Sequence, residues 1–475
     1  MATSWNEGKC YPISPRKTVK CSATRLGPDC KSHALRGLAE KVKVKMALDK
    51  CILYLDENFA KLRNNEETVC VQKAIEEAVS ALVRSVGEQD ARFLGKIEPS
   101  GSFYEGTKIL RPDEFDFVVT LSRLSEFCDI VYQGGRRPHH ILVRFCPCEK
   151  DVMWHSCVDF CREMSNVEMV DPITGTYSIL DGPFLYLDGS RLKQRFYCLL
   201  REAFKSVKWP ENLKFVSSTG FAFDEMGLSG TTQFAASEKI DFLWRGNLKV
   251  SVDLALAIEF KGWPSLPGLF DDLLVEGHPA YSLKMDMKSS GFHATPKVDV
   301  IWRISWSRAE KAILNYIFNR NEQAAISCRV AKMIKETHFV EVIEQSSSNL
   351  PMSICKSYTL KHLLMYLWLS NSSSSECLAK GCGEMLLDLL KLLVDGLKTG
   401  DCKQIFGNFS TVKTGPLLPF FASAVEKCIR TLSEMQNVEI SQVPRRCEDF
   451  FKDKIHVTLP RPPRKLSSYK ITKIH

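Results

Sequence analysis

The sequence of 475 residues lacks any apolar run long enough to span a bilayer, and its polar start lacks the apolar stretch of a secretory signal. The longest apolar stretches, near Leu363 and Met385, are short or are interrupted by charged residues. Without a route to secretion, the 18 cysteines are expected to be reduced thiols rather than disulfides. These absences predict a cytoplasmic protein with no membrane partner.

A strong charge bias and internal repeats are also absent. The net charge of +8 and the pI of about 8.6 permit a polyanionic partner but do not require one. With 44% hydrophobic and 25% charged residues, the composition is that of a globular protein, and the length suggests two lobes rather than one core. We divide the chain into a basic flexible arm (1–33), a mixed α/β lobe with leading helices (34–300), a helical lobe (301–442) and a loosely held basic tail (443–475).

Hydrophobic periodicity supports this division. Strands are predicted between residues 93 and 257, in DFVVTL, HHILVRF, FLYLDG, KIDFLWR and LKVSVDLALAIEF, with a helix in RLKQRFYCLLREAFKSV. From residue 300 to about residue 437 the pattern predicts helices, beginning with WRISWSRAEKAIL. The predicted fold class is therefore α+β, with a mixed β-sheet, N-terminal helices and a helical C-terminal lobe.

The stretch GSFYEGTKILRPDEFDFVVTL, residues 101–121, joins a Gly-Ser turn to a strand with two carboxylates. Glu114 and Asp116 share one face of that strand, because side chains two residues apart point the same way, while Phe115 and Phe117 point to the other. Two such carboxylates repel, so one is hard to ionise unless a cation lies between them. The alternatives are half of a metal site or a solvated acidic sheet face.

A later strand supplies a third carboxylate. In LKVSVDLALAIEF, Asp253 lies on a face of small residues, where a metal would offset the cost of burying its charge. A hydrogen bond from a neighbouring loop is the alternative. Together the Gly-Ser turn, Glu114, Asp116 and Asp253 predict a nucleotidyltransferase palm, in which Ser102 and the turn hold nucleotide phosphates and the three acids hold two Mg²⁺ or Mn²⁺ ions.

At these residues the chain resembles the cyclic GMP–AMP synthase-like receptors of the Mab-type nucleotidyltransferases. The resemblance continues through SVDLALAIE, GFHATPKVDVIWRISWSRAEKAIL, CRVAKMIKE and SYTLKHLLMYL, and covers roughly residues 34–437. It implies a two-lobed enzyme that makes a cyclic dinucleotide from ATP and GTP. It also implies catalytic and metal-binding roles for Glu114, Asp116 and Asp253.

The resemblance further implies nucleotide contacts, by segment. On the ATP side they are Ser102, Glu114, Phe115, Asp116, Lys335, Ser357, Tyr358, Thr359, Leu360 and Lys361. On the GTP side they are Asp253, Arg303, Ile304, Ser305, Trp306, Ser307, Arg308, Ala309 and Glu310. Structural alternatives remain: a capping box of Ser307 with Glu310, a solvated face for Lys332 and Lys335, and a core position for Tyr358.

One departure concerns zinc. The DNA-sensing member of the family has a zinc thumb, whereas the corresponding gap here, NYIFNRNEQAAISCRV, offers Cys328 as its one metal-type ligand, so no structural zinc is expected there. A different cluster, CPCEKDVMWHSC, contains Cys146, Cys148, His155 and Cys157, but its Cys-x-Cys spacing is not that of usual tetrahedral sites. Buried free thiols are favoured there.

The missing thumb favours double-stranded RNA over double-stranded DNA as the activating ligand, as in thumb-less relatives. Such RNA is recognised through phosphates and 2′-hydroxyls, so a basic groove suffices. The candidate residues are Lys41, Lys43, Lys45, Arg329 and Lys332, and the alternative is ordinary surface charge. The predicted function is synthesis of 2′–5′/3′–5′ cyclic GMP–AMP that signals to a cyclic-dinucleotide receptor in innate antiviral defence. The alternatives are a catalytically inactive Mab-type adaptor and a linear oligoadenylate synthase.

Overall fold

The computed structural model describes residues 46–63, 65–132, 140–146, 156–171, 176–219, 237–264, 269–338, 357–370, 380–402, 406 and 418–452. All of them belong to one compact unit, residues 45–475. The predicted basic arm, residues 1–33, lies outside the described residues.

The strands are β1 (Lys96–Ser100), β2 (Glu114–Thr120), β3 (Cys128–Tyr132), β4 (His140–Phe145), β5 (Cys161–Met164), β6 (Val167–Val170), β7 (Tyr177–Leu180), β8 (Phe184–Leu187), β9 (Leu213–Ser218), β10 (Glu238–Trp244), β11 (Leu248–Phe260), β12 (Phe292–Val298) and β13 (Ile301–Ser305). One large sheet runs in the order β1-β2-β11-β12-β13-β4-β8-β5, while β10 joins β11 to β9 and β3 pairs with β4. Strands β6 and β7 form a separate hairpin.

The helices before residue 300 are 46–55, η1 (Asp56–Ala60), α2 (Glu66–Gln89), η2 (Ala91–Phe93), α3 (Gly101–Tyr104), α4 (Ser122–Ser125), η3 (Val158–Phe160), α6 (Gly189–Ser206), α8 (Leu269–Leu273) and α9 (Tyr281–Ser290). Those after it are α10 (Ser307–Arg320), α11 (Glu322–His338), α13 (Ser357–Leu369), α15 (Cys382–Thr399), α16 (Leu418–Glu434), η5 (Met435–Asn437), η6 (Ile440–Gln442) and α17 (Val443–Lys452). The predicted α+β fold class is confirmed.

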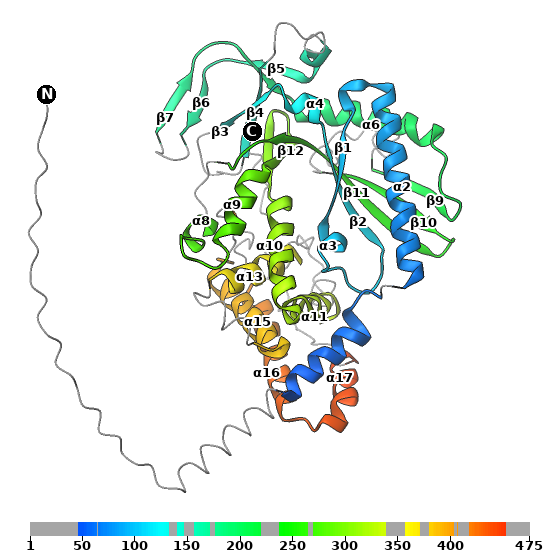
Figure 1. The fold of residues 1–475 in the computed structure, drawn as a ribbon, viewed down its shortest axis with the longest axis vertical. Coiled ribbons are helices and arrows are strands. Elements are labelled where there is room, and N and C mark those ends of the chain that lie inside the picture. The colour runs from blue at the N-terminus through cyan, green and yellow to red at the C-terminus, as the bar shows by residue number, and fades with distance from the viewer. Residues whose placement is uncertain are drawn as a thin grey trace, which may run out of the picture. The chain divides into compact units, whose positions relative to one another are not determined.

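The two long helices of the first half begin at side-chain caps. Asn65 accepts a hydrogen bond from the Thr68 backbone N–H at 2.9 Å, and α2 starts at the next residue. Asp188 does the same for α6, accepting from the backbone N–H groups of Ser190 and Arg191. Both helices then bury one apolar face against the sheet and against each other (Figure 1).

The sheet has one apolar face and one polar face. Phe115, Phe117 and Val119 are almost fully buried, as the alternation of β2 predicts. On the same face, rings from α6 and from the loop after it pack against β9 and β10, with Phe204 tilted on Phe215 and Trp209 edge-on to Phe242. The opposite face carries the polar side chains of β2 and β11 and faces helix α10.

The core passes through both predicted lobes. A single apolar cluster includes Phe115 of the sheet, Ile313 of α10 and Leu390 of α15. The predicted division at residue 300 therefore does not correspond to a break in the core. This continuity fixes the helical half against the polar sheet face.

Two predictions near this division are corrected. Residues 301–305 were expected to begin a helix, but they form β13, which pairs with β12 and β4. The reason is tertiary, since Trp302 is fully buried and its indole N–H donates to the Leu187 carbonyl at 2.9 Å. The mixed sheet consequently extends five residues beyond the predicted lobe boundary.

The predicted loose tail is also corrected at its start. Residues 443–452 form helix α17, because Val443, Cys447 and Phe450 share one helix face and are buried. His338 stacks on Phe450, which ties this helix to α11. The rest of the predicted tail lies outside the described residues. Among the helices that the structure describes, none is both long and apolar enough to cross a membrane.

Candidate active site

The three predicted carboxylates meet on the polar face of the sheet. Strand β11 runs parallel to β2, and their register pairs Asp253 with Asp116 and Ser251 with Glu114. Because paired residues on neighbouring strands point to the same face, Asp253 lies beside Asp116. Within the described residues, neither aspartate side chain accepts a hydrogen bond. The alternative in which a described loop satisfies Asp253 is therefore wrong.

The charges of these acids oppose one another. Burial, followed by the charges of Glu114, Asp253 and Glu105, raises the pKa of Asp116 to about 7. Burial and Glu114 also raise the pKa of Asp253. Burial acts the same way on Glu114, but nearby lysines, above all Lys108, bring its pKa below the usual value. Three crowded carboxylate ligands fit a hard divalent cation such as Mg²⁺ or Mn²⁺.

The Gly-Ser segment touches this group directly. Gly101 has a φ of 73°, and a Cβ placed on it would lie 1.8 Å from Asp116 Oδ2. Glycine is required here both by the left-handed backbone and by the close approach of the carboxylate. The predicted turn is the one-turn helix α3, and its Ser102 lines a cavity next to the three acids.

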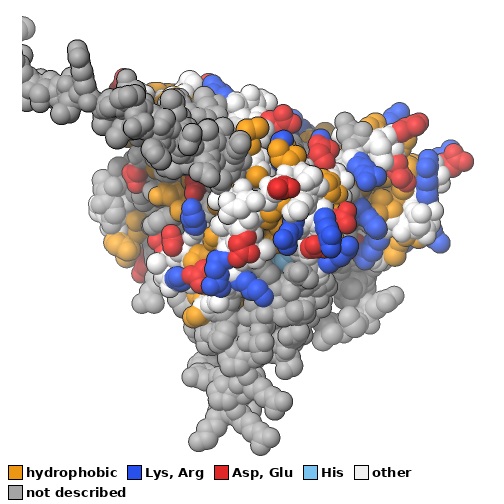
Figure 2. Space-filling model, turned by 90° about the horizontal axis from the view of Figure 1, so that it is seen from below, with side chains coloured by type: hydrophobic (Ala, Val, Ile, Leu, Met, Phe, Trp, Pro, Cys, Tyr) orange, Lys and Arg blue, Asp and Glu red, His pale blue; other side chains and the backbone are white. Residues whose placement is uncertain are grey.

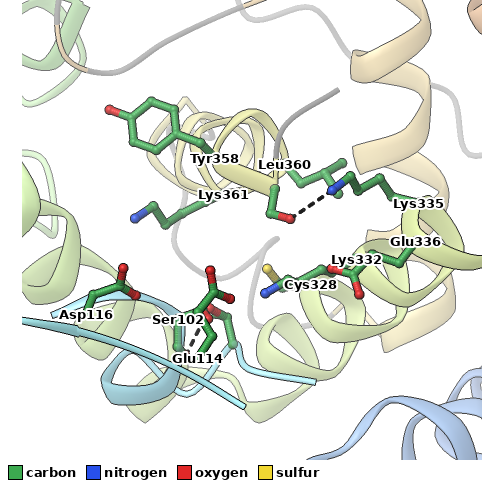
Figure 3. A pocket seen from close by; sticks show the side chains of 12 residues that line it. Ser102, Glu114, Asp116, Cys328, Lys332, Lys335, Glu336, Tyr358, Leu360 and Lys361 are labelled. Carbon is green, nitrogen blue, oxygen red and sulfur yellow. Dashed lines mark hydrogen bonds between the residues drawn. The ribbon is translucent and has the colours of Figure 1, made fainter. Parts of the chain in front are cut away.

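A cavity of about 430 Å³ separates the sheet from the helical half (Figure 3). Its lining residues come from three regions: Ser102, Thr107, Glu114 and Asp116 from α3, β2 and the loop between them; Cys328, Lys332, Lys335 and Glu336 from α11; and Ser357, Tyr358, Leu360 and Lys361 from α13. Glu114 and Asp116 thus line one wall, and three lysines, together with Glu336, line the opposite one.

Lys332 and Lys335 both face this cavity. Lys332 is buried, and burial lowers its pKa, while Lys335 donates to the Ser357 hydroxyl at 3.3 Å. The solvated-face alternative for these two lysines is wrong. Two ammonium groups opposite three carboxylates can bind the phosphates of a ligand whose cations contact the acids.

Tyr358, Lys361 and Glu310 form one buried polar network. The Tyr358 hydroxyl donates to Glu310 Oε1 at 2.8 Å, and Lys361 Nζ lies 2.6 Å from Glu310 Oε2. His362 contacts Oε1 at 3.1 Å, and Lys361 also pairs with Glu105 at 3.1 Å. Burial alone would raise the pKa of Glu310, but the charge of Lys361 holds this pKa well below its usual range. The network joins the Gly-Ser helix to α10 and α13.

The remaining predicted GTP-side residues divide into two groups. Arg303 and Ser305 lie on β13, on the same face as the carboxylates because Ser305 pairs with His293, which pairs with Glu259. Ile304, Trp306 and Ala309 are buried apolar side chains. Ser307 is not a helix cap: Trp306 occupies that position, without a side-chain capping bond, and Ser305 donates to the Ser307 hydroxyl. The capping-box alternative is therefore wrong.

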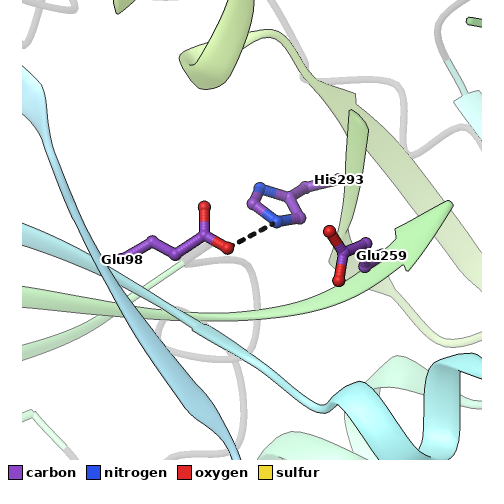
Figure 4. A group of neighbouring side chains, drawn as sticks. All are labelled: Glu98, Glu259 and His293. Carbon is purple, nitrogen blue, oxygen red and sulfur yellow. Dashed lines mark ion pairs between the residues drawn. The ribbon is translucent and has the colours of Figure 1, made fainter. Parts of the chain in front are cut away.

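Arg308 was predicted to be a GTP contact, but its guanidinium is bound elsewhere. Its Nε is 2.9 Å from Glu98 Oε2, and its Nη1 is 2.6 Å from Glu259 Oε1. These two acids and His293 offer ligand atoms within 4.8 Å of one another (Figure 4). Burial, together with Arg308, lowers the pKa of His293 to about 4, so the imidazole is neutral. Arg308 already supplies the cation of this group.

The structure describes three of the cysteines on which the zinc predictions depend. Asn321 alone separates α10 from α11, and Cys328 is buried in the cavity wall, where burial raises its pKa to about 11. Cys146 donates to Asp129 Oδ2 at 3.2 Å, and Cys157 is buried. Cys148 and His155 lie outside the described residues.

The predicted activator-binding residues are only partly described. Lys41, Lys43 and Lys45 lie outside the described residues. Arg329 forms a two-point ion pair with Asp56, at 2.8 and 2.5 Å, so this guanidinium is already bound, and Lys332 faces the cavity. These positions argue against an activator surface at either residue. On the face shown in Figure 2, basic side chains are interspersed with acidic ones.

Among the residues that sequence reasoning missed are three that contact predicted site residues. Lys108 and Glu105 lie inside the quoted motif stretch, between the Gly-Ser segment and β2, and His362 follows Lys361. A charged residue in a short loop between two motif halves is a usable signal for the first two. His362 gives no comparable signal, because its role depends on α10 lying against α13.

Two comparisons with known proteins bear on the family of the chain. Residues 103–316 match the family model of the Mab-21 protein nucleotidyltransferase domain. The chain is also 23% identical over 411 residues to the cyclic GMP-AMP synthase of Mus musculus, an alignment that covers 82% of this chain and 69% of that protein. The predicted family resemblance and the nucleotidyltransferase fold are confirmed.

Proposed function

Because residues 103–316 form a nucleotidyltransferase domain of the Mab-21 type, we propose that this protein joins ATP and GTP into a cyclic dinucleotide. The product we propose is 2′–5′/3′–5′ cyclic GMP–AMP, made in two phosphoryl transfers that each release pyrophosphate. The match to the family model supports nucleotide transfer in general. The cyclic product is the part of the proposal that goes beyond this match. The name of the mouse relative motivates the particular product.

One observation carries the proposal. Asp116 and Asp253 are paired across parallel strands, and Glu114 and Asp116 border a cavity whose opposite wall holds Lys332 and Lys335. An inactive adaptor has no need to keep three repelling carboxylates in one place, because their proximity costs stability. A phosphoryl-transfer site needs that arrangement.

Glu114, Asp116 and Asp253 are the residues that would hold two Mg²⁺ or Mn²⁺ ions. When bound, these ions lower the pKa of an attacking ribose hydroxyl and neutralise charge on the leaving pyrophosphate. Ser102 and Lys335 donate to the triphosphate from opposite sides of the cavity, and Lys332 adds positive charge between them.

The adenine base is assigned to the helical half, and the guanine base to β13 and the start of α10. Tyr358 offers an aromatic face for stacking at the cavity, and its hydroxyl and Lys361 are held by Glu310. Ser357, Thr359 and Leu360 complete the ATP-side segment; Ser357 and Leu360 line the cavity, whereas Thr359 is buried and does not line it. Arg303, Ser305 and Glu310 are proposed for the guanine side.

Activation and localisation belong to the same proposal. Double-stranded RNA is the proposed activator and double-stranded DNA the less favoured one, in a cytoplasmic sensor of innate antiviral defence whose product acts on a cyclic-dinucleotide receptor. The support is the direct junction of α10 and α11 at Asn321, where the DNA-sensing relatives have their zinc thumb.

Thin-layer chromatography tests the activity. Purified full-length protein is incubated with labelled ATP and GTP and with Mg²⁺ or Mn²⁺, in the presence of double-stranded RNA, double-stranded DNA or neither. The matched control is the Glu114→Ala/Asp116→Ala variant. The expected result is a phosphatase-resistant product that requires both nucleotides and double-stranded RNA and is absent in the variant.

The other outcomes are equally informative. A phosphatase-sensitive ladder from ATP alone identifies a linear oligoadenylate synthase. A product with DNA alone overturns the RNA assignment. Nucleotide binding without turnover across a broad panel of nucleic acids and other ligands supports the adaptor alternative.

A further inference from the structure

Lys108 is a nearly buried lysine that contacts one of the three acids. It lies in the loop between α3 and β2 and is 9% exposed. Its Nζ is 2.7 Å from Asp113 Oδ1 and 3.1 Å from Glu114 Oε2. Burial alone would lower the pKa of Lys108, but Asp113 and Glu114 raise it above its ordinary value. The side chain is therefore a fixed cation.

The loop that carries Lys108 is held at both ends. The Thr107 backbone N–H donates to the Ser102 carbonyl at 2.9 Å, and the Leu110 N–H donates to the Ala60 carbonyl at 3.0 Å. Leu110 has a φ of 64°, a conformation that a side-chain-bearing residue adopts only where its surroundings require it. The backbone of the loop is thus held independently of the contact between Lys108 and Glu114.

Asp113 ties the same loop to the neighbouring strand. Its carbonyl accepts from the Ser251 N–H at 2.8 Å, two residues before Asp253. Lys108, Glu114 and the strand that bears Asp253 consequently share one rigid frame. A displacement of the Lys108 backbone relative to the acids would require breaking these backbone bonds.

Glu114 needs such a partner more than Asp116 does. Its side chain is 50% exposed, so repulsion from Asp116 and Asp253 would turn it toward water. Lys108 binds Oε2, whereas Oε1 accepts no hydrogen bond from the described residues. Lys332 and Lys239 also lower the pKa of Glu114, but neither forms a hydrogen bond with it within the described part of the chain.

We propose that Lys108 is a positioning residue, which binds one oxygen of Glu114 and leaves the other free, beside Asp116, for a divalent cation. This inference rests on the proposed function. It makes Glu114 a one-oxygen ligand, which suits the strict octahedral geometry of Mg²⁺. Partners that orient a ligating carboxylate typically change metal affinity by about 10- to 100-fold when they are removed.

The test measures Mn²⁺ binding directly, without turnover. Free Mn²⁺ is quantified by electron paramagnetic resonance during titration of the full-length protein, with no nucleotide present. The variants are Lys108→Met, which keeps the length and apolar stem, and Lys108→Arg, which keeps the charge and donors. Lys205→Met is the control, because Lys205 is exposed on α6 and pairs with Glu202. Glu114→Gln removes the charge of the proposed metal ligand itself and shows how much Mn²⁺ binding depends on it. Thermal unfolding without metal shows that each variant is folded.

The expected result is about tenfold weaker Mn²⁺ binding in Lys108→Met, with partial recovery in Lys108→Arg and no change in Lys205→Met. Unchanged or tighter binding in folded Lys108→Met overturns the proposal, because a lysine that merely repels the cation gives tighter binding when removed. If the wild-type protein binds Mn²⁺ no better than Glu114→Gln does, the metal-dependent function fails as well. The two failures are thus distinguishable.

Discussion

Two groups of acidic side chains lie on the same face of one sheet and have opposite electrostatic character. Asp116 and Asp253 are paired across β2 and β11, and Glu98 and Glu259 lie farther along on β1 and β11. In the first group the pKa of Asp116 rises to about 7. In the second, Arg308 outweighs the effect of burial and lowers the pKa of Glu98.

The two groups differ in whether the protein itself supplies a cation that pairs with their carboxylates. The second group receives the guanidinium of Arg308 from α10, with its carboxylates bound at 2.9 and 2.6 Å. In the first group, to which Glu114 also belongs, Lys108 contacts Glu114 but, within the described residues, neither Asp116 nor Asp253. An acidic cluster with its own arginine stabilises the fold, whereas one without such a partner is prepared for a ligand.

The largest contrast is expected in activity. Asp253→Asn should lower product formation by about 1,000-fold or more, since a lost metal ligand costs several kcal/mol of transition-state stabilisation. Glu259→Gln, on the same strand and face, should keep most of the activity. Initial rates in the chromatographic assay measure both. Similar losses in the two variants would remove the distinction between the groups.

The second contrast is in pH dependence, which should have opposite signs. The folded protein holds a proton on Asp116 up to about pH 7, whereas an unfolded aspartate loses it near its usual value of 3.8. Asp116 therefore destabilises the fold increasingly as pH rises from about 4 to 7, and Asp116→Asn should relieve at most about 4 kcal/mol above that window.

Glu98 should behave in the reverse way. Because the pKa of Glu98 is lowered in the folded protein, Glu98 stabilises the fold at pH values above its ordinary pKa. This contribution disappears as the pH falls through the lowered pKa. Glu98→Gln should therefore be destabilising at pH 7 and nearly neutral in acid. Urea unfolding of both variants, from pH 8 down to the lowest pH at which the protein is folded and without added metal, checks the signs. Parallel profiles would contradict the comparison.

A smaller effect is expected when the arginine is removed. Arg308→Met leaves Glu98 and Glu259 close together without a cation, which should lower the free energy of unfolding by about 2–3 kcal/mol, less than for a fully buried pair because these groups are partly solvated. Chemical denaturation at pH 7 measures this. Arg303→Met, on the exposed side of β13, is the control, and an equal loss there would show that the ion pairs are not responsible.

The smallest effect is expected at His293. Because burial lowers its pKa to about 4, the ring is neutral and contributes no charge at pH 7. Its Nε2 lies 3.2 Å from the Thr120 hydroxyl, so His293→Gln should cost about 1 kcal/mol, the value of one hydrogen bond. A strong dependence of this loss on pH between 6 and 8 would show that the imidazole is charged after all.

Local pattern was sufficient for much of the fold. The alternation of β2 and β11 predicted which side chains are buried, and the structure agrees for Phe115, Phe117 and Val252. It failed at residues 301–305, where the sequence next to a helix start gives no sign that β4 and β12 lie on either side. It also failed at α17, whose short apolar stripe lies among charged residues of both signs.

The sequence by itself determined that Glu114 and Asp116 share a face and that Asp253 lies on the polar side of its strand, because a period of two is a local property of the backbone. Only the tertiary structure decided which acids receive a cation. Arg308 reaches Glu98 from 210 residues away, and Lys332 is turned into the cavity rather than toward solvent. Charge pairing depends on distances between segments, and these distances exist only once the helices have packed against the sheet.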